Sequence, residues 1–274
     1  MLITDDFVFL NYPKTGSTFT RTVIKEIHKQ RLARRTLTRR CLDIVGFTPR
    51  LFMRELMLPN IKVSHTKQSR DQHGCYCQIP TAYANREVAT VVRNPYTRFL
   101  SGYEFRWWKK FPLVPDSMLA EYFPSFPDLD IDDYVRLNQL GMVHSRLNGR
   151  SVSAKIGNQT VQFIQMFFKN PKDVLENISD DYMDSDRIFE DIAPITFLRQ
   201  EQLNDELAAF LKTKGYSQKE TDYIRQREKV NVTEKLVPNR NDLWTENALN
   251  YVQTYDRMIF KILASKGIEY GVPS

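Results

Sequence analysis

The sequence predicts an α/β fold with a mainly parallel central sheet flanked by helices. Short runs rich in β-branched or aromatic residues alternate with longer segments whose apolar residues recur at helical spacing. Helices that connect parallel strands cover both faces of a sheet, so this alternation favours parallel pairing. The four predicted strands are Phe7–Leu10, Ile61–His65, Val88–Val92 and Ile195–Leu198.

The predicted helices begin and end at local signals. Asn94 is the expected N-cap of one helix, with Pro95 at its first position. Gly215 and Gly267 are expected to end two others. The four predicted helices are Thr18–Gln30, Pro95–Trp108, Gln200–Lys214 and Glu246–Lys266.

Size and composition limit the class of protein. The 274 residues, 42% of them hydrophobic, suffice for one large domain over residues 1–274. Residues 111–133, with several prolines, aromatic residues and acids, form either a lid or acceptor wall or an ordinary surface connection. No stretch approaches the ~20 apolar residues of a membrane helix, and the start lacks signal-peptide features. We therefore expect a cytoplasmic protein without a membrane span.

Charge and cysteine content narrow the possible partners. The net charge of +6 suits either a nucleic acid or a small polyanionic ligand. The basic run 31–40 is read as a solvated face rather than a binding rim. Three cysteines, an odd count, do not suggest a disulfide framework, and His73 alone does not complete a zinc site. No metal is expected.

A strand that runs into a Lys/Thr/Gly/Ser turn and then a helix forms a cradle for an anion. Residues 11–19 read Asn-Tyr-Pro-Lys-Thr-Gly-Ser-Thr-Phe and follow the apolar run Phe7–Leu10. The turn exposes backbone N–H groups, the helix N-terminus adds its positive dipole end, and Lys14 adds a full charge. We call residues 11–16 the anion loop, and we expect it to bind a phosphate or sulfate ester.

The anion loop differs from the loop of nucleotide kinases. A Walker A loop reads G-x-x-x-x-G-K-[ST], with the lysine after the second glycine. In this chain Lys14 precedes Gly16, the first glycine of the pattern is absent, and position 13 is a proline. No acidic strand end offers a magnesium ligand. Both features count against phosphoryl transfer from ATP.

A second predicted phosphate site follows the strand Val88–Val92. Arg93 leaves the strand end, where its guanidinium can bind a phosphate with two N–H groups, and Ser101 adds a hydroxyl two turns into the next helix. Ligands of open α/β sheets bind beyond the carboxyl ends of the strands. Lys14, His65 and Arg93 all lie at or just past such ends, so we expect them at one edge of the sheet.

These motifs resemble those of sulfotransferases that use 3′-phosphoadenosine 5′-phosphosulfate (PAPS). Pro-Lys-Thr-Gly-Ser-Thr-Phe resembles their 5′-phosphosulfate loop, and Arg93–Tyr103 resembles their 3′-phosphate motif, R-x-P-x-x-R-x-x-S-x-Y. Thr196–Leu203 resembles the F-x-R-x-E-x-L segment of carbohydrate-type members, and residues 231–256 look like their C-terminal region. Residues 111–191 show no clear match. The resemblance implies a P-loop-like sulfotransferase fold with PAPS as co-substrate.

The resemblance also implies roles for particular residues. Lys14 would stabilise the leaving oxygen, while Arg93 and Ser101 would bind the 3′-phosphate. Phe19 would lie near the adenine, or else pack in the core. The backbone N–H groups expected to bind the 5′-phosphate belong to Thr15, Gly16, Ser17 and Thr18, with the last two hydroxyls assisting.

The catalytic base is expected among the histidines or glutamates. His65 resembles the family's catalytic histidine, and a neutral imidazole suits proton abstraction. The family often has a lysine two residues before this histidine, where this sequence has Val63. Many carbohydrate sulfotransferases use a glutamate instead, which leaves Glu55 and Glu104 as alternatives. His144 could contact the acceptor or pack, and His28 is expected to be a solvated helix residue.

The expected activity is transfer of a sulfuryl group from PAPS to a hydroxyl of a small molecule or glycan, with a carbohydrate as one candidate. Trp107 and Trp108 are candidates for binding a sugar ring, or else core or hinge residues. Two other functions stay open. One is an ATP-dependent P-loop kinase. The other is a non-catalytic protein that binds nucleic acid, although no nucleic-acid partner is expected.

Overall fold

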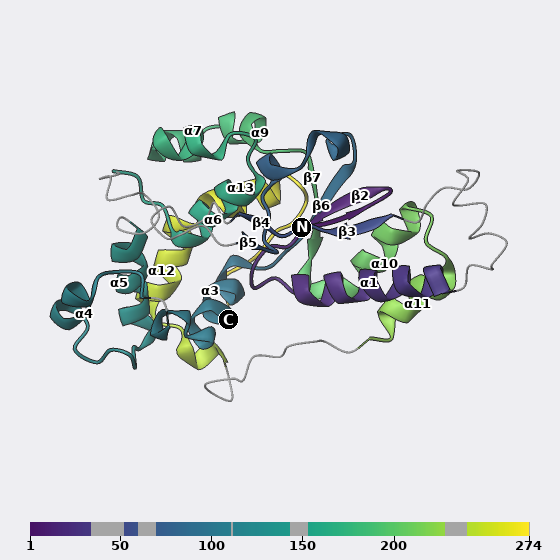
Figure 1. Ribbon diagram of the computed structural model, residues 1–274. Coiled ribbons are helices and arrows are strands. Elements are labelled where there is room, and N and C mark those ends of the chain that lie inside the picture. Colours follow the sequence, from purple (N-terminus) through teal and green to yellow (C-terminus); the bar gives the residue numbers. More distant parts are fainter. Residues whose placement is uncertain (34–51, 60–69, 111, 143–152, 228–239, 274) are drawn as a thin grey trace.

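The computed structural model describes residues 1–33, 52–59, 70–110, 112–142, 153–227 and 240–273 (Figure 1). Its main sheet has five strands in the order β3-β1-β2-β6-β7. They span Leu2–Thr4 (β1), Phe7–Leu10 (β2), Met53–Glu55 (β3), Glu87–Val92 (β6) and Ile195–Arg199 (β7). A second sheet pairs β4 (Leu58–Pro59) with β5 (Arg70–Asp71). The predicted strand Ile61–His65 lies outside the described residues.

The main sheet is mixed, so the prediction of a mainly parallel sheet was wrong. Strands β2, β6 and β7 are parallel neighbours, but β1 pairs antiparallel with both β2 and β3. Thr4 causes the first reversal, because its hydroxyl donates to the carbonyl of Phe7 at 3.0 Å and accepts from the N–H of Phe7 at 3.1 Å. These bonds close a tight turn that folds β1 back along β2.

Helices cover both faces of the sheet. Phe7 and Phe9 point to one face, where they pack in a core with α1, α10 and α11. Val8 and Leu10 point to the other face, in a core with α6 and α13. This alternation gives three layers, as Figure 1 shows. The five helices span Ser17–Ala33 (α1), Asn158–Phe167 (α6), Leu203–Thr213 (α10), Gln218–Arg225 (α11) and Arg257–Ala264 (α13).

A third core lies at the end of the molecule that carries α4 in Figure 1. It joins α3 (Pro95–Phe105), α5 (Ile131–Gly141) and α12 (Glu246–Tyr255). The segment read as a lid or surface connection belongs to it, since α4 (Asp116–Tyr122) and the turns around it contribute buried residues. Those residues are Val114, Leu119, Phe123 and Leu129, and Ile131 of α5 follows them in the same core.

Two predicted helices end differently from expectation. Helix α3 ends at Phe105, because Arg106 takes a left-handed conformation (φ 50°) and a 3₁₀ turn follows over Trp107–Lys109. The predicted helix Glu246–Lys266 is divided at Asp256 into α12 and α13. Short helices complete the described chain, namely α7 (Pro171–Glu176), α8 (Asp180–Asp184), α9 (Arg187–Asp191) and the 3₁₀ turns Tyr76–Gln78, Thr81–Tyr83, Gln200–Gln202 and Arg240–Leu243.

Among the described residues, none of the helices has the length and apolar character needed to cross a membrane.

Candidate functional site

The segments that follow β2, β6 and β7 contact one another. A guanidinium nitrogen of Arg93 (Nη1), which follows β6, donates to the carbonyl of Lys14 at 3.4 Å. The backbone N–H of Asn94 donates to Glu201, just past β7, at 2.9 Å. A Cβ atom added to Gly16 would lie 3.1 Å from Leu203. The edge predicted for the site is therefore assembled from these strand ends, with Lys14 and Arg93 side by side.

The anion loop contains two left-handed residues. Lys14 has φ 66° and Gly16 has φ 86°. Such a backbone costs a lysine about 1–2 kcal/mol, so surrounding contacts must stabilise it. The Thr15 hydroxyl donates to the carbonyl of Tyr12 at 2.9 Å, and Arg98 Nε donates to the carbonyl of Pro13 at 3.2 Å.

Helix α1 begins directly after the loop. Ser17 is its first residue, and the first N–H groups of a helix have no partner within the helix. The N–H groups of Ser17 and Thr18 therefore belong to the positive end of a 17-residue helix. Phe19 is 4% exposed and packs in the core beneath α1, which is the alternative that the sequence left open for it.

The predicted 3′-phosphate residues lie just before α3 (Arg93) and within it (Ser101). Arg93 Nε donates to the hydroxyl of Thr97 at 2.9 Å, which orients the guanidinium. Ser101, one turn farther, is buried. One turn beyond Ser101, the ring of Phe105 lies under the Lys14 ammonium, 3.9 Å from the nitrogen. Thr97 is part of the motif but was not among the predicted phosphate ligands.

Two exposed aromatic rings stack on each other, and one of them, Phe105, lies under Lys14. Phe105 and Trp107 are 49% and 51% exposed, and their rings are 5.6 Å apart at an angle of 12°. The left-handed Arg106 between them turns the chain so that both rings reach the surface. Trp108 is instead buried, and its indole N–H donates to the carbonyl of Pro127 at 3.3 Å. The two tryptophans thus separate into a surface residue and a core residue.

The histidines fall into three groups. His65 and His144 lie outside the described residues. His28 is buried rather than solvated, because α11 covers α1 and the Tyr216 hydroxyl lies 2.5 Å from its Nε2. Burial lowers the pKa of His28 to about 4. His73, considered in the sequence only as a metal ligand, has Nδ1 2.6 Å from the carbonyl of Asn11 in the anion loop.

The tautomer of His73 follows from its neighbours. A carbonyl oxygen only accepts, so Nδ1 must donate to Asn11. The amide of Gln72 lies 3.4 Å from Nε2, which can then accept. His73 is therefore an oriented imidazole that contacts Asn11, the residue directly after β2 and three residues before Lys14.

The alternative bases, both glutamates, lie on different elements. Glu55 on β3 forms ion pairs with Arg21, at 3.3 Å, and with Lys25 of α1. Glu104 is buried on α3, three residues after Ser101. Glu104 therefore lies beside the row of predicted phosphate ligands, whereas Glu55 pairs with the middle of α1.

Sequence reasoning missed a buried polar chain behind the loop. Arg98, Gln159 and Asp256 connect α3, α6 and the junction of α12 with α13 by hydrogen bonds of 3.0 and 2.7 Å. Arg98 is part of the quoted motif, which was the only signal for it. We call these three residues the buried relay.

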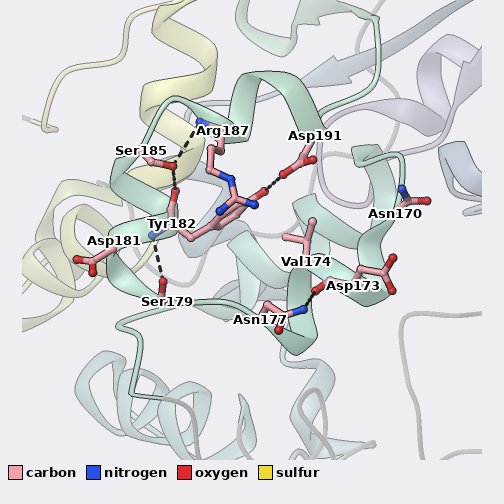
Figure 2. Close-up of a pocket in the computed structure, with 10 residues that line it drawn as sticks. All are labelled: Asn170, Asp173, Val174, Asn177, Ser179, Asp181, Tyr182, Ser185, Arg187 and Asp191. Atoms are coloured by element: carbon pink, nitrogen blue, oxygen red, sulfur yellow. Dashed lines mark hydrogen bonds between the residues drawn. The ribbon is translucent and has the colours of Figure 1, made fainter.

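The described surface has a hollow of about 730 Å³ elsewhere, over α7, α8 and α9 (Figure 2). Tyr182 lies at its centre and donates to Asp191 at 2.7 Å. Helix α9 leads into the amino end of β7, whereas Lys14 and Arg93 lie past carboxyl ends. The lining residues are Asn170, Asp173, Val174, Asn177, Ser179, Asp181, Tyr182, Ser185, Arg187 and Asp191, none of them a predicted site residue.

Among the described residues, no group of three or more His, Cys, Asp or Glu side chains could hold a metal ion. Cys75 and Cys77 carry thiol groups, the first buried and the second exposed. Comparison of the whole chain with models of protein families, with curated proteins and with solved structures finds no match.

Proposed function

We propose that the chain is a PAPS-dependent sulfotransferase. One observation carries the proposal: Arg93 donates to the carbonyl of Lys14 at 3.4 Å, although the two residues are 79 positions apart. Each belongs to a different phosphate motif, and each motif leads into the N-terminus of a helix. Two cationic side chains and two helix N-termini at one edge suit a ligand with two separated phosphate groups.

The proposed reaction is an in-line displacement at sulfur. The acceptor oxygen forms a bond to sulfur while the bond from sulfur to the 5′-phosphate oxygen breaks, and adenosine 3′,5′-bisphosphate leaves with the electron pair. Lys14 stabilises the negative charge on the leaving oxygen. Arg93 and Ser101 bind the 3′-phosphate. His65 accepts the proton of the acceptor hydroxyl.

A carbohydrate hydroxyl is the proposed acceptor. The exposed ring of Phe105 lies under the Lys14 ammonium, which the acceptor must approach, and the exposed ring of Trp107 stacks on Phe105. Aromatic faces provide apolar contact with little loss of side-chain freedom, while polar groups supply orientation. The apolar face of a sugar ring can pack on such a surface and leave a hydroxyl directed toward sulfur.

Transfer can be measured with PAPS labelled in the sulfuryl group and a panel of glycans and small hydroxyl compounds. We expect label on a carbohydrate acceptor, without added magnesium. His65→Ala should retain nucleotide binding and lose transfer. Label on no acceptor, together with magnesium-dependent transfer of phosphate from ATP, would support the kinase alternative instead.

A further inference from the structure

The buried relay connects the junction of α12 and α13 to the anion loop. Gln159 Nε2 donates to Asp256 Oδ2 at 2.7 Å, and Gln159 Oε1 accepts from Arg98 Nη1 at 3.0 Å. Arg98 Nε donates to the carbonyl of Pro13 at 3.2 Å. Asp256 is 0% exposed, and the other two relay residues are also buried. The chain of bonds ends one residue before Lys14.

Asp256 sets the direction of the amide between it and Arg98. A carboxylate only accepts hydrogen bonds, and a guanidinium only donates them. Gln159 must therefore turn its NH₂ group toward Asp256 and its oxygen toward Arg98. The same NH₂ group also donates to the carbonyl of Pro95 at 3.1 Å, at the first turn of α3. The relay therefore has one polarity, which the carboxylate determines.

The site around Asp256 is built for a carboxylate. The N–H and hydroxyl of Thr160 donate to Oδ1 at 3.0 and 2.9 Å. A Cβ atom at Gly157 would lie 2.5 Å from the same oxygen, so only glycine allows this approach. Both carboxylate oxygens are thus bonded.

At the other end, Arg98 contacts the backbone that leads into Lys14. Its guanidinium lies 4.1 Å from the centre of the Tyr12 ring, and it binds the carbonyl of Pro13. Lys14 follows with φ 66°. A lysine keeps a left-handed backbone only where its surroundings determine it, and Arg98 supplies part of those surroundings.

We propose that Asp256 is a positioning residue for the anion loop: acting through Gln159 and Arg98, it stabilises the backbone that presents Lys14 to the anion. Only the identity of that anion rests on the proposed function. The loop geometry itself can be tested without a ligand.

The test is amide hydrogen exchange of the full chain, comparing wild type with Asp256→Asn. An asparagine that keeps its oxygen on Thr160 turns its NH₂ group toward the NH₂ of Gln159, and the relay breaks. We expect exchange in residues 14–18 to become about tenfold faster, with exchange in α10 unchanged. Asp184→Asn is the matched control, because Asp184 pairs with the neighbouring Arg257 at 2.7 Å and has no part in the relay.

A second substitution tests the polarity. In the double variant Asp256→Asn with Gln159→Glu, the new carboxylate accepts from both asparagine and Arg98 but loses the bond to the Pro95 carbonyl, so loop exchange should return part of the way toward the wild-type rate. A purely structural loss at Asp256 would not be rescued. If Asp256→Asn alone does not fold, Gln159→Met breaks the relay while it keeps Asp256, and it should accelerate loop exchange in the same way.

Two results would overturn the positioning role: wild-type loop exchange in the broken-relay variant, or no rescue in the double variant. Calorimetry of wild type with adenosine 3′,5′-bisphosphate is a separate measurement. An absence of binding there would refute the proposed function and leave the exchange result standing.

Discussion

Asp256→Asn should also change how the stability of the protein depends on pH. Burial raises the pKa of Asp256 from 3.8 to about 6, although hydrogen bonds from Gln159 and Thr160 and the charge of Arg98 oppose the rise. A carboxyl group whose pKa is raised in the folded state stabilises the fold when protonated. Its contribution is full below pH 3.8 and is lost as the pH rises through about 6.

The expected size follows from the shift. A change of about two pKa units corresponds to about 3 kcal/mol, since each unit is worth about 1.4 kcal/mol. Asparagine does not titrate. The free energy of unfolding of the variant, relative to wild type, should therefore rise by about 3 kcal/mol between about pH 3.5 and about pH 7.

The assay is urea unfolding of both proteins across this pH range. The comparison is needed because His28 acts in the opposite direction. Burial lowers its pKa from 6.5 to about 4, so its contribution is present above pH 6.5 and lost as the pH falls through about 4. The difference between the two proteins cancels this effect. A difference that does not change with pH would refute the assignment of a raised pKa to Asp256.

Three further results are expected. Gly16→Ala should lower the free energy of unfolding by about 1–2 kcal/mol in urea, because φ 86° disfavours alanine, whereas Gly271→Ala, with nothing within 4 Å and no positive φ, should change it little. Trp107→Ala should raise the KM for a glycan acceptor about tenfold without changing nucleotide affinity, and an unchanged KM would remove the ring from the acceptor site. His65→Ala should abolish turnover while His73→Ala retains it, and the reverse result would transfer the role of base to His73.

The parallel part of the sheet could be predicted because its signals are local. Apolar runs identified β2, β6 and β7, and Asn94 does cap α3, with the N–H of Tyr96 donating to it at 2.9 Å. Strand β1 has only three residues, and its direction depends on the turn at Thr4. The break at Asp256 was missed because apolar spacing continues across it.

The candidate site likewise has a part that local sequence signals predict and a part that depends on long-range contacts. The rule that ligands lie beyond strand ends was enough to bring Lys14 and Arg93 together. The relay was not predictable, since its contacts join residues 61 and 97 positions apart. Polar residues on a helical pattern are usually assigned to solvent, and only the packing of α6 against α3 shows that Gln159 is buried.

Calorimetry of nucleotide binding decides whether the anion loop and Arg93 form one nucleotide site. Wild type should bind adenosine 3′,5′-bisphosphate more tightly than adenosine 5′-monophosphate, which lacks the 3′-phosphate, and magnesium should not be needed. Arg93→Met should remove this preference, because a bidentate arginine–phosphate contact is lost. Arg86→Met, the same change before the amino end of β6, should keep the preference. No binding of adenosine 3′,5′-bisphosphate to wild type at about millimolar nucleotide, or an equal preference in Arg93→Met, would show that Lys14 and Arg93 do not form a site for this nucleotide.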